Sequence, residues 1–189
     1  MAIRDYIRQR FFPHILCPGC GHGTVLNNML HAFDQLGLDQ NETVMVSGIG
    51  CSSRIAGYVD VHSLHTLHGR ALAFATGIKM SRPGLTVIVP MGDGDAMAIG
   101  GNHFIHACRR NIDLTAIVMN NRIYGMTGGQ FSPLSGTGIS SSTSPHKTID
   151  PPFDIVSLSL SAGASFVART TSAHYKEIRS YIQQALRNP

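Results

Sequence analysis

The chain of 189 residues lacks the features of membrane and secreted proteins. It has no run of about 18 apolar residues, the length that a helix needs to cross a bilayer, so no membrane span is predicted. Its first residues, Met1 to Tyr6, carry charges where a signal peptide needs an apolar core. We therefore expect a cytoplasmic protein.

Charged residues are scarce, at 14% of the chain, and tryptophan is absent. The net charge of +4 is scattered, with no Lys/Arg run and no aromatic residues among basic ones, so no nucleic-acid partner is predicted. The low charge favours a surface partly covered by other protein chains. In a reducing compartment the four cysteines indicate metal binding or catalysis rather than disulfides.

Apolar residues alternate between helical spacing and short continuous runs, which predicts alternating helices and strands. Helices are expected over 24–36, 71–80, 96–110, 153–160 and 172–186, and strands over 43–46, 85–89, 114–119 and 166–169. Residues 1–16 are expected to form an arm, and 55–68 an irregular stretch. Residues 120–152, rich in Gly, Ser, Thr and Pro, are expected to form a functional or disordered loop.

Such an alternation predicts an α/β protein with a doubly wound, mostly parallel sheet. No linker or internal repeat divides the chain, so we expect residues 1–189 to form a single domain. Ligands of doubly wound sheets bind at the carboxyl ends of the strands. The loops after Val46, Val89 and Met119 all carry glycines and lie at that edge of the predicted sheet.

Polar residues follow two of these strands. Gly92-Asp93-Gly94-Asp95 comes after one, and Asn120-Asn121 after the next. Carboxylate and carboxamide oxygens suit Mg²⁺, which often bridges to phosphate, and the helix expected from Ala96 places N–H groups beside the glycines. The alternative is that both stretches are turns at strand ends.

The cysteines and histidines leave several interpretations open. Cys17 and Cys20 have the spacing of a zinc half-site, a redox pair or an iron–sulfur site, and Cys51 favours the last. Cys108 is expected to be a small core residue. The steps of three residues through His62, His65 and His68 suit metal binding on a helix, but no helical pattern supports them.

Five motifs occur in a fixed order. They are Cys-Pro-Gly-Cys-Gly-His-Gly at 17–23, Ile-Gly-Cys-Ser-Ser-Arg at 49–54, His-Thr-Leu-His-Gly-Arg-Ala at 65–71, Gly-Asp-Gly-Asp-Ala at 92–96 and Asn-Asn-Arg-Ile-Tyr-Gly-Met-Thr-Gly-Gly-Gln at 120–130. Over nearly its whole length the chain resembles the beta subunit of 2-oxoacid:ferredoxin oxidoreductases, most closely the 2-oxoglutarate type. The resemblance implies a thiamine-diphosphate-binding fold. It also implies CoA-dependent oxidative decarboxylation of a 2-oxoacid, with electrons passed to ferredoxin.

The resemblance also assigns residues to a cofactor site. It implies that Mg²⁺ is held by Asp93, Asn121 and the carbonyl of Ile123. The residues expected to line the diphosphate are Gly94, Asp95, Gly125 and Met126, and those expected to contact the thiamine are Ile49, Gly50, Cys51, Ser52 and His68. We expect His68 and Arg54 to be catalytic. The Arg54 guanidinium suits the carboxylate of the 2-oxoacid, although a surface arginine or a partner ion pair would explain it as well.

Cys17, Cys20 and Cys51 match three ligands of the family's [4Fe–4S] cluster. The fourth ligand of the family lies farther along the chain, about where this sequence ends, so we expect the 189 residues to be truncated at the C-terminus.

The glutamate that activates thiamine is also missing, because Glu42 and Glu177 lie in no suitable motif. The resemblance places that glutamate on a partner alpha subunit that carries the pyrimidine-binding domain. Two rival functions remain at this point. One is a non-oxidative thiamine-dependent 2-oxoacid decarboxylase subunit, which would contain no iron. The other is a non-catalytic metal-binding subunit, which would bind zinc without thiamine.

Overall fold

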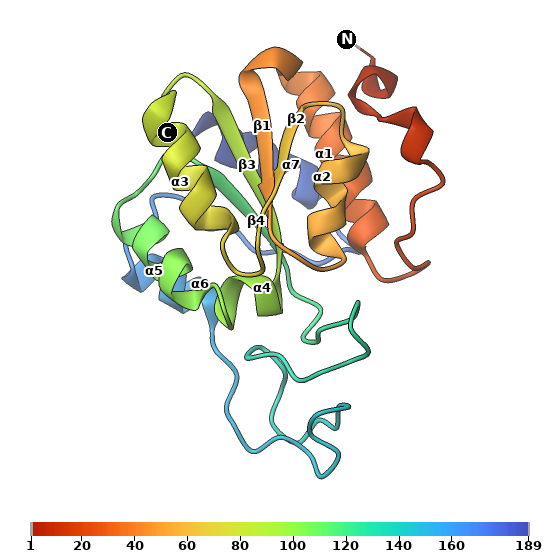
Figure 1. Ribbon diagram of the computed structural model, residues 1–189, viewed down its shortest axis with the longest axis vertical. Helices are drawn as coiled ribbons and strands as arrows, with labels where there is room; N and C mark the ends of the chain where they lie inside the picture. Colours follow the sequence, from red (N-terminus) through yellow and green to blue (C-terminus); the bar gives the residue numbers. More distant parts are fainter. Residues whose placement is uncertain (1, 189) are drawn as a thin grey trace.

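The apolar runs form the strands of one parallel sheet in the computed structural model, which describes residues 2–188. The strands are β1 (Thr43–Ser47), β2 (His62–His65), β3 (Thr86–Gly92) and β4 (Thr115–Met119). Their order across the sheet is β2-β1-β3-β4, and every neighbouring pair is parallel. The strands fan out in Figure 1 with their carboxyl ends pointing down.

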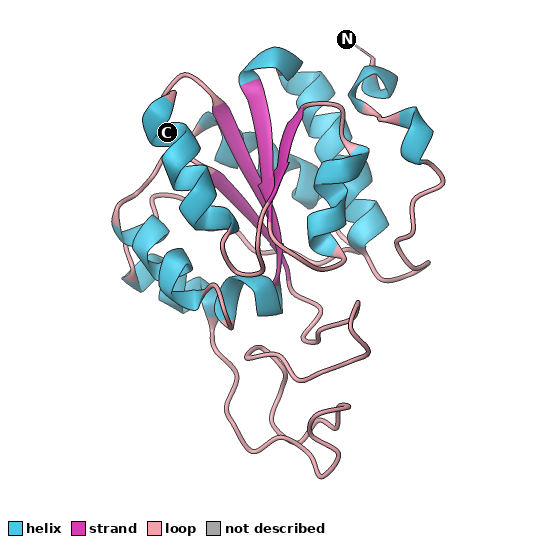
Figure 2. Ribbon diagram, in the orientation of Figure 1, coloured by secondary structure: helices cyan, strands magenta, loops and turns pink. Residues whose placement is uncertain are grey.

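Helices cover both faces of this sheet (Figure 2). The α-helices are α1 (His22–Leu36), α2 (Ile55–Tyr58), α3 (Ala71–Ser81), α4 (Asp93–Met97), α5 (Gly101–Arg109), α6 (Ile155–Ser161) and α7 (Tyr175–Arg187). Short 3₁₀ helices span Ile3–Tyr6, Gln9–Phe11, Gln40–Glu42 and Ser52–Arg54. No helix among residues 2–188 is both long enough and apolar enough to cross a membrane.

Two hydrophobic cores explain why the helices divide between the faces. Successive residues of a strand point to opposite sides of the sheet. Met45 and Ile88 therefore pack with α1, α2 and α7, while their neighbours Val44, Val46 and Val87 pack with α3 and α5. The predicted α/β fold with a doubly wound parallel sheet is confirmed.

The strand order reverses at β1. The chain leaves β1 toward β2 on one side, and then continues with β3 on the other side of β1. Ligands of open parallel sheets bind where the order reverses in this way. The loops after β1 and β3, which carry the motifs at 49–54 and 92–96, diverge from this point.

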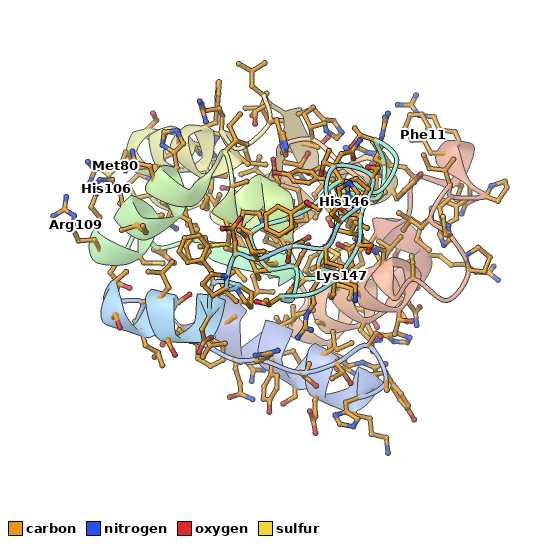
Figure 3. All side chains as sticks on the ribbon, turned by 90° about the horizontal axis from the view of Figure 1, so that it is seen from below. Phe11, Met80, His106, Arg109, His146 and Lys147 are labelled. Atoms are coloured by element: carbon orange, nitrogen blue, oxygen red, sulfur yellow. The ribbon has the colours of Figure 1, made fainter. Side chains whose placement is uncertain are left out.

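Residues 120–154 form the predicted long loop, which contains no helix or strand. In Figure 1 the loop lies below the carboxyl edge. Figure 3 looks up from that side, and His146 and Lys147 of the loop lie near the middle of the view. Backbone hydrogen bonds such as Ser142 N–H to Gly129 O (3.0 Å) and Phe153 N–H to Pro133 O (3.0 Å) fold the loop on itself.

The first residues do not form a free arm, contrary to the prediction for 1–16. Tyr6 is fully buried against α1, and its hydroxyl donates a hydrogen bond to the carbonyl of Leu38 at 2.7 Å. Arg8 forms an ion pair with Asp60 (3.3 Å). Burying an aromatic ring and satisfying its hydroxyl ties this segment to the domain.

Two strand predictions differ from the structure. β2 was missed because its residues are all exposed and lack an apolar pattern, so that its pairing with β1 alone defines it. The strand predicted over 166–169 is wrong. That segment lines a cavity of about 570 Å³ together with β4. A strand must lie about 4.8 Å from its partner, and no pairing between these segments occurs within residues 2–188.

The helix predicted over 96–110 is two helices, α4 and α5. The chain breaks at Ala98, whose ψ of −95° is not helical, and restarts after Gly100. A side chain at Gly100 would overlap the carbonyl oxygen of Asp95, so the close packing of the two turns requires glycine here.

Candidate active site

The register of the sheet brings the two polar motifs together. Gly92 at the end of β3 is paired with Met119 at the end of β4. The next residues, Asp93 at the start of α4 and Asn120-Asn121 after β4, therefore leave the sheet side by side. The prediction that these motifs sit at neighbouring strand ends is confirmed.

The Asp93 carboxylate, the Asn121 amide and the Ile123 carbonyl converge where these segments meet. The side-chain amide of Asn121 has two orientations, related by exchange of its oxygen and nitrogen. In one of them Nδ2 donates to Asp93 Oδ1 and to the carbonyl oxygen of Ile123, at 2.9 Å each. In the other the amide oxygen faces the same two oxygens. Neighbouring ligands of an octahedral Mg²⁺ with bonds of about 2.0–2.1 Å are about 2.9 Å apart, so this set fits the ion.

The Asp93 carboxyl group is almost completely buried, with 1% of the residue exposed. Burial raises its pKa, and a hydrogen bond from the Ser132 hydroxyl to Oδ2 acts in the opposite direction. Ser132 is itself fully buried and comes from the long loop. Ser132 was not predicted from the sequence, because nothing in its spacing from Asp93 indicates contact.

Tyr124 was also missed, although it lies within the motif at 120–130. Its hydroxyl donates to the Gly94 carbonyl (3.1 Å), and burial is the main reason that its pKa is raised. A side chain at Gly94 would overlap the tyrosine ring. The ring also meets His68 edge to face, with centroids 5.7 Å apart. Tyr124 therefore joins the loop after β4 to those after β2 and β3.

The loop after β1 reaches the same region. Ser52 Oγ lies 2.9 Å from Nε2 of His22, which is buried, and burial lowers the pKa of this histidine. A side chain added at Gly125 would lie 4.0 Å from the Cys51 sulfur and 3.7 Å from Asn121 Nδ2. The loops predicted to hold the thiamine and the diphosphate are thus in contact. Ile49 and Met126 are 48% and 40% exposed, so these loops present apolar side chains at the surface.

Asp95 directs its carboxylate into the protein. Oδ1 accepts hydrogen bonds from the Gly69 N–H (2.7 Å) and from Nδ1 of His68 (2.5 Å). His65 is bonded separately, with Nδ1 2.8 Å from Ser47 Oγ. No three His, Cys, Asp or Glu side chains of residues 2–188 gather into a metal-binding group, so a metal run through His62, His65 and His68 is not formed.

The cysteines lie on neighbouring loops without being gathered into one group. Cys17 and Cys20 are exposed on a turn closed by the Cys20 N–H and the Cys17 carbonyl (3.3 Å). Burial raises the pKa of Cys51, and the charges of Cys17 and Cys20 raise it further, because the three sulfurs lie close enough to interact. Cys51 packs against the core beneath α1, whereas Cys108 on α5 packs against the core on the other face.

Arg54 and the two glutamates, Glu42 and Glu177, lie in different parts of the structure. Arg54 is exposed at the end of the loop after β1. Its charge lowers the pKa of His65, where burial has the larger effect. Both glutamates lie elsewhere: Glu42 pairs with Arg82 (3.0 Å), and Glu177 accepts from the Thr170 hydroxyl (2.6 Å).

The fold and the loops at its carboxyl edge define a class of cofactor-binding domain. Residues 48–189 match the family described as thiamine pyrophosphate enzyme, C-terminal TPP binding domain. The chain is also similar to the 2-oxoglutarate synthase subunit KorB of Archaeoglobus fulgidus, with 54% identity over 184 residues. That alignment covers 97% of this chain and 68% of the relative.

Two further similar proteins are also 2-oxoacid:ferredoxin oxidoreductases or their subunits. The 2-oxoacid:ferredoxin oxidoreductase subunit beta of Saccharolobus solfataricus is 44% identical over 174 residues, which is 91% of this chain and 57% of that subunit. The solved structure of a 2-oxoglutarate:ferredoxin oxidoreductase from Magnetococcus marinus, with 2-oxoglutarate, coenzyme A and succinyl-CoA bound, has a TM-score of 0.96 and 41% identity, and covers 99% of this chain and 64% of that one. The chain belongs to the family of 2-oxoacid:ferredoxin oxidoreductase beta subunits. It spans about two thirds or less of the length of these relatives.

The raised pKa of Asp93 yields a stability prediction for Asp93→Asn. A group whose pKa is raised by folding contributes stability that is fully present below its unfolded pKa and is lost as the pH rises through its folded pKa. At neutral pH the wild-type carboxylate must lose its hydration, whereas asparagine carries no charge. We expect urea unfolding of the variant without added Mg²⁺ to show a higher midpoint at neutral pH, and the gain to shrink on acidification. A lower midpoint than wild type at neutral pH would contradict this, and the exposed Asp150→Asn serves as the control.

Proposed function

We propose that this chain forms the thiamine diphosphate site of a 2-oxoacid:ferredoxin oxidoreductase, with 2-oxoglutarate as the preferred substrate. The observation that carries the proposal is the convergence of the Asp93 carboxylate, the Asn121 amide and the Ile123 carbonyl. The Asn121 amide lies 2.9 Å from both Asp93 Oδ1 and the Ile123 carbonyl oxygen, so the orientation that turns its oxygen toward them would give one Mg²⁺ three oxygen ligands. Membership of the family supplies the reaction: oxidative, CoA-dependent decarboxylation with electrons passed to ferredoxin.

The residues present fit the cofactor as follows. Asp93, Asn121 and the Ile123 carbonyl would hold Mg²⁺, and Gly94, Asp95, Gly125 and Met126 would line the diphosphate. Residues 49–52 and His68 contact the thiamine, and Arg54 binds the substrate carboxylate. Bound thiamine diphosphate supplies the carbon nucleophile and the electron sink for decarboxylation. The chain positions the cofactor, excludes water with the apolar side chains of Ile49 and Met126, and provides His68 for proton transfer.

The partners follow from the same proposal. Glu42 pairs with Arg82 and Glu177 with Thr170, away from Asp93 and Asn121, so the activating glutamate comes from an alpha subunit that carries the pyrimidine-binding domain. Ferredoxin accepts the electrons, and coenzyme A accepts the acyl group; 2-oxoglutarate and coenzyme A are bound in the Magnetococcus marinus enzyme. Residues 1–189 act as a single cofactor-binding domain in this assembly, and the cytoplasmic location stays a prediction.

The iron–sulfur cluster is also part of the proposal. Cys17, Cys20 and Cys51 supply three thiolates from two neighbouring loops, and a [4Fe–4S] cluster requires four. Cys108 packs on the opposite face of the sheet from Cys51, so it is not the fourth ligand. A cluster at this position, next to the loop that contacts the thiamine, would receive electrons directly from the cofactor site.

The cofactor assignment is tested with Asp93→Asn in the chain assembled with its alpha subunit. Replacing the charged metal ligand should abolish Mg²⁺-dependent binding of thiamine diphosphate, as measured by titration calorimetry. Asp113→Asn, an exposed change at the far end of β4, should leave binding intact. Unchanged cofactor affinity in Asp93→Asn would refute the magnesium site and, with it, this function.

Arg54→Met tests the substrate contact. A charge-assisted hydrogen bond contributes roughly 1.5–3 kcal/mol, so kcat/KM for 2-oxoglutarate should fall about ten- to a hundredfold. The affinity for thiamine diphosphate should not change. The matched control is Arg109→Met, at the outer edge of the molecule in Figure 3. If kcat/KM is the same in Arg54→Met and wild type, Arg54 does not bind the substrate.

Single serine substitutions test the cluster ligands. Cys17→Ser, Cys20→Ser and Cys51→Ser should each lower the iron content of the assembled enzyme and weaken the paramagnetic resonance of its reduced cluster. Cys108→Ala should retain both. Loss of iron in Cys108→Ala, with iron kept in Cys51→Ser, would reverse the assignment.

A further inference from the structure

Asp95 stands two residues after the metal-binding Asp93, yet it makes a different set of contacts. Its side chain is 1% exposed. Oδ1 accepts from the Gly69 N–H at 2.7 Å and lies 2.5 Å from Nδ1 of His68. A longer contact joins it to the Ile49 N–H at 3.5 Å. One carboxylate oxygen therefore connects the loops after β1, β2 and β3.

These contacts determine where His68 carries its proton. A backbone N–H can only donate, so Oδ1 is already an acceptor toward Gly69. The histidine nitrogen that shares this oxygen must also donate. In the neutral imidazole the proton is then on Nδ1, and Nε2 is left as the acceptor.

The other ring nitrogen, Nε2, is not among the buried side-chain atoms that lack a hydrogen-bond partner. The His68 side chain is 32% exposed, and within residues 2–188 Nε2 forms no hydrogen bond. The ring meets Tyr124 edge to face, and Tyr124 donates to the carbonyl of Gly94. Nε2 is thus available to a ligand beside the loops that carry Gly94 and Gly125.

The carboxylate has no room to turn away. A side chain at Gly48 would overlap both oxygens of Asp95, so the loop after β1 passes directly against them. Oδ2 forms no hydrogen bond within the described chain, which leaves Oδ1 as the oxygen that organises the loops. Gly48 is required by this close approach, since its backbone conformation is not a left-handed one.

We propose that Asp95 is a positioning residue, which holds His68 in the Nδ1–H tautomer and presents Nε2 as the proton acceptor toward the bound cofactor and substrate. The proposal rests on the function proposed above, because it assigns a task to a residue of that same site.

The tautomer is measured first, in the chain without cofactor, by nitrogen-15 NMR of the histidine rings, with His68 assigned through His68→Gln. Wild type should show His68 protonated at Nδ1. Asp95→Ala, which removes the acceptor, should populate both tautomers. Asp95→Asn should restore the wild-type pattern, because its amide oxygen is held toward the Gly69 and Ile49 N–H groups. Protonation of wild-type His68 at Nε2 would overturn the proposal.

Kinetics in the assembled enzyme separate positioning from a general structural role. Loss of an orienting partner typically costs 10–100-fold, so kcat of Asp95→Ala should fall by about that factor, with Asp95→Asn much closer to wild type. In a His68→Gln background Asp95→Ala should cost nothing further, since contacting residues that act as one unit are not additive. The same loss in both backgrounds would show that Asp95 acts independently of His68, and would overturn the proposal.

The exposed Asp60→Asn serves as the control, with kcat expected at the wild-type value. A wild-type assembly that shows no thiamine-dependent turnover would refute the proposed function instead. The tautomer measurement, made on the chain alone, would still decide the role of Asp95.

Discussion

The pairing of Gly92 with Met119 is the contact on which the rest of the site depends. Because β3 and β4 are parallel and end at this pair, the residues that follow each strand leave the sheet next to each other. A shift of one residue between β3 and β4 would move Asp93 away from Asn121 by about 3.3 Å and separate the three oxygens. The register is maintained by the apolar residues of both strands, whose alternation divides them between two cores. The packing of the sheet therefore sets the geometry of the candidate metal site.

This geometry has a cost in the absence of a cation. Asp93 is buried, its pKa is raised, and its Oδ1 faces the Asn121 amide, which presents either its oxygen or its nitrogen. The Ser132 hydroxyl, the backbone at the start of α4 and, in one of its orientations, the Asn121 amide offset part of the loss of hydration. Groups that are unfavourable for folding tend to gather at functional sites, where a ligand compensates for them.

Asp93 and Asp95 lie in the same short helix, α4, but their side chains contact different parts of the structure. Residues two apart on a helix point to nearly opposite sides. Asp93 therefore faces the loop after β4, while Asp95 faces the loops after β1 and β2. The Asp93 carboxylate is the proposed ligand of the ion, and the Asp95 carboxylate binds protein groups. Tyr124 and His68 complete the connection, because their ring contact joins the segments that the two aspartates organise.

The sequence by itself determined the fold class, the central strands, the long loop and the family, because these depend on local periodicity and on motifs within a few residues. It also indicated that Asp93 and Asn121 would meet, since both follow apolar runs. Only the tertiary structure decided which residues distant in the chain contact the site residues. Ser132 lies 39 residues from Asp93 in the chain, and Asp95 lies 27 from His68. The exposed strand β2, the burial of Tyr6 and the unpaired segment at 166–169 have the same cause. Each of these three features depends on which backbone or side chain lies next to it in the folded protein. The residues adjacent in the sequence do not indicate which neighbour that is.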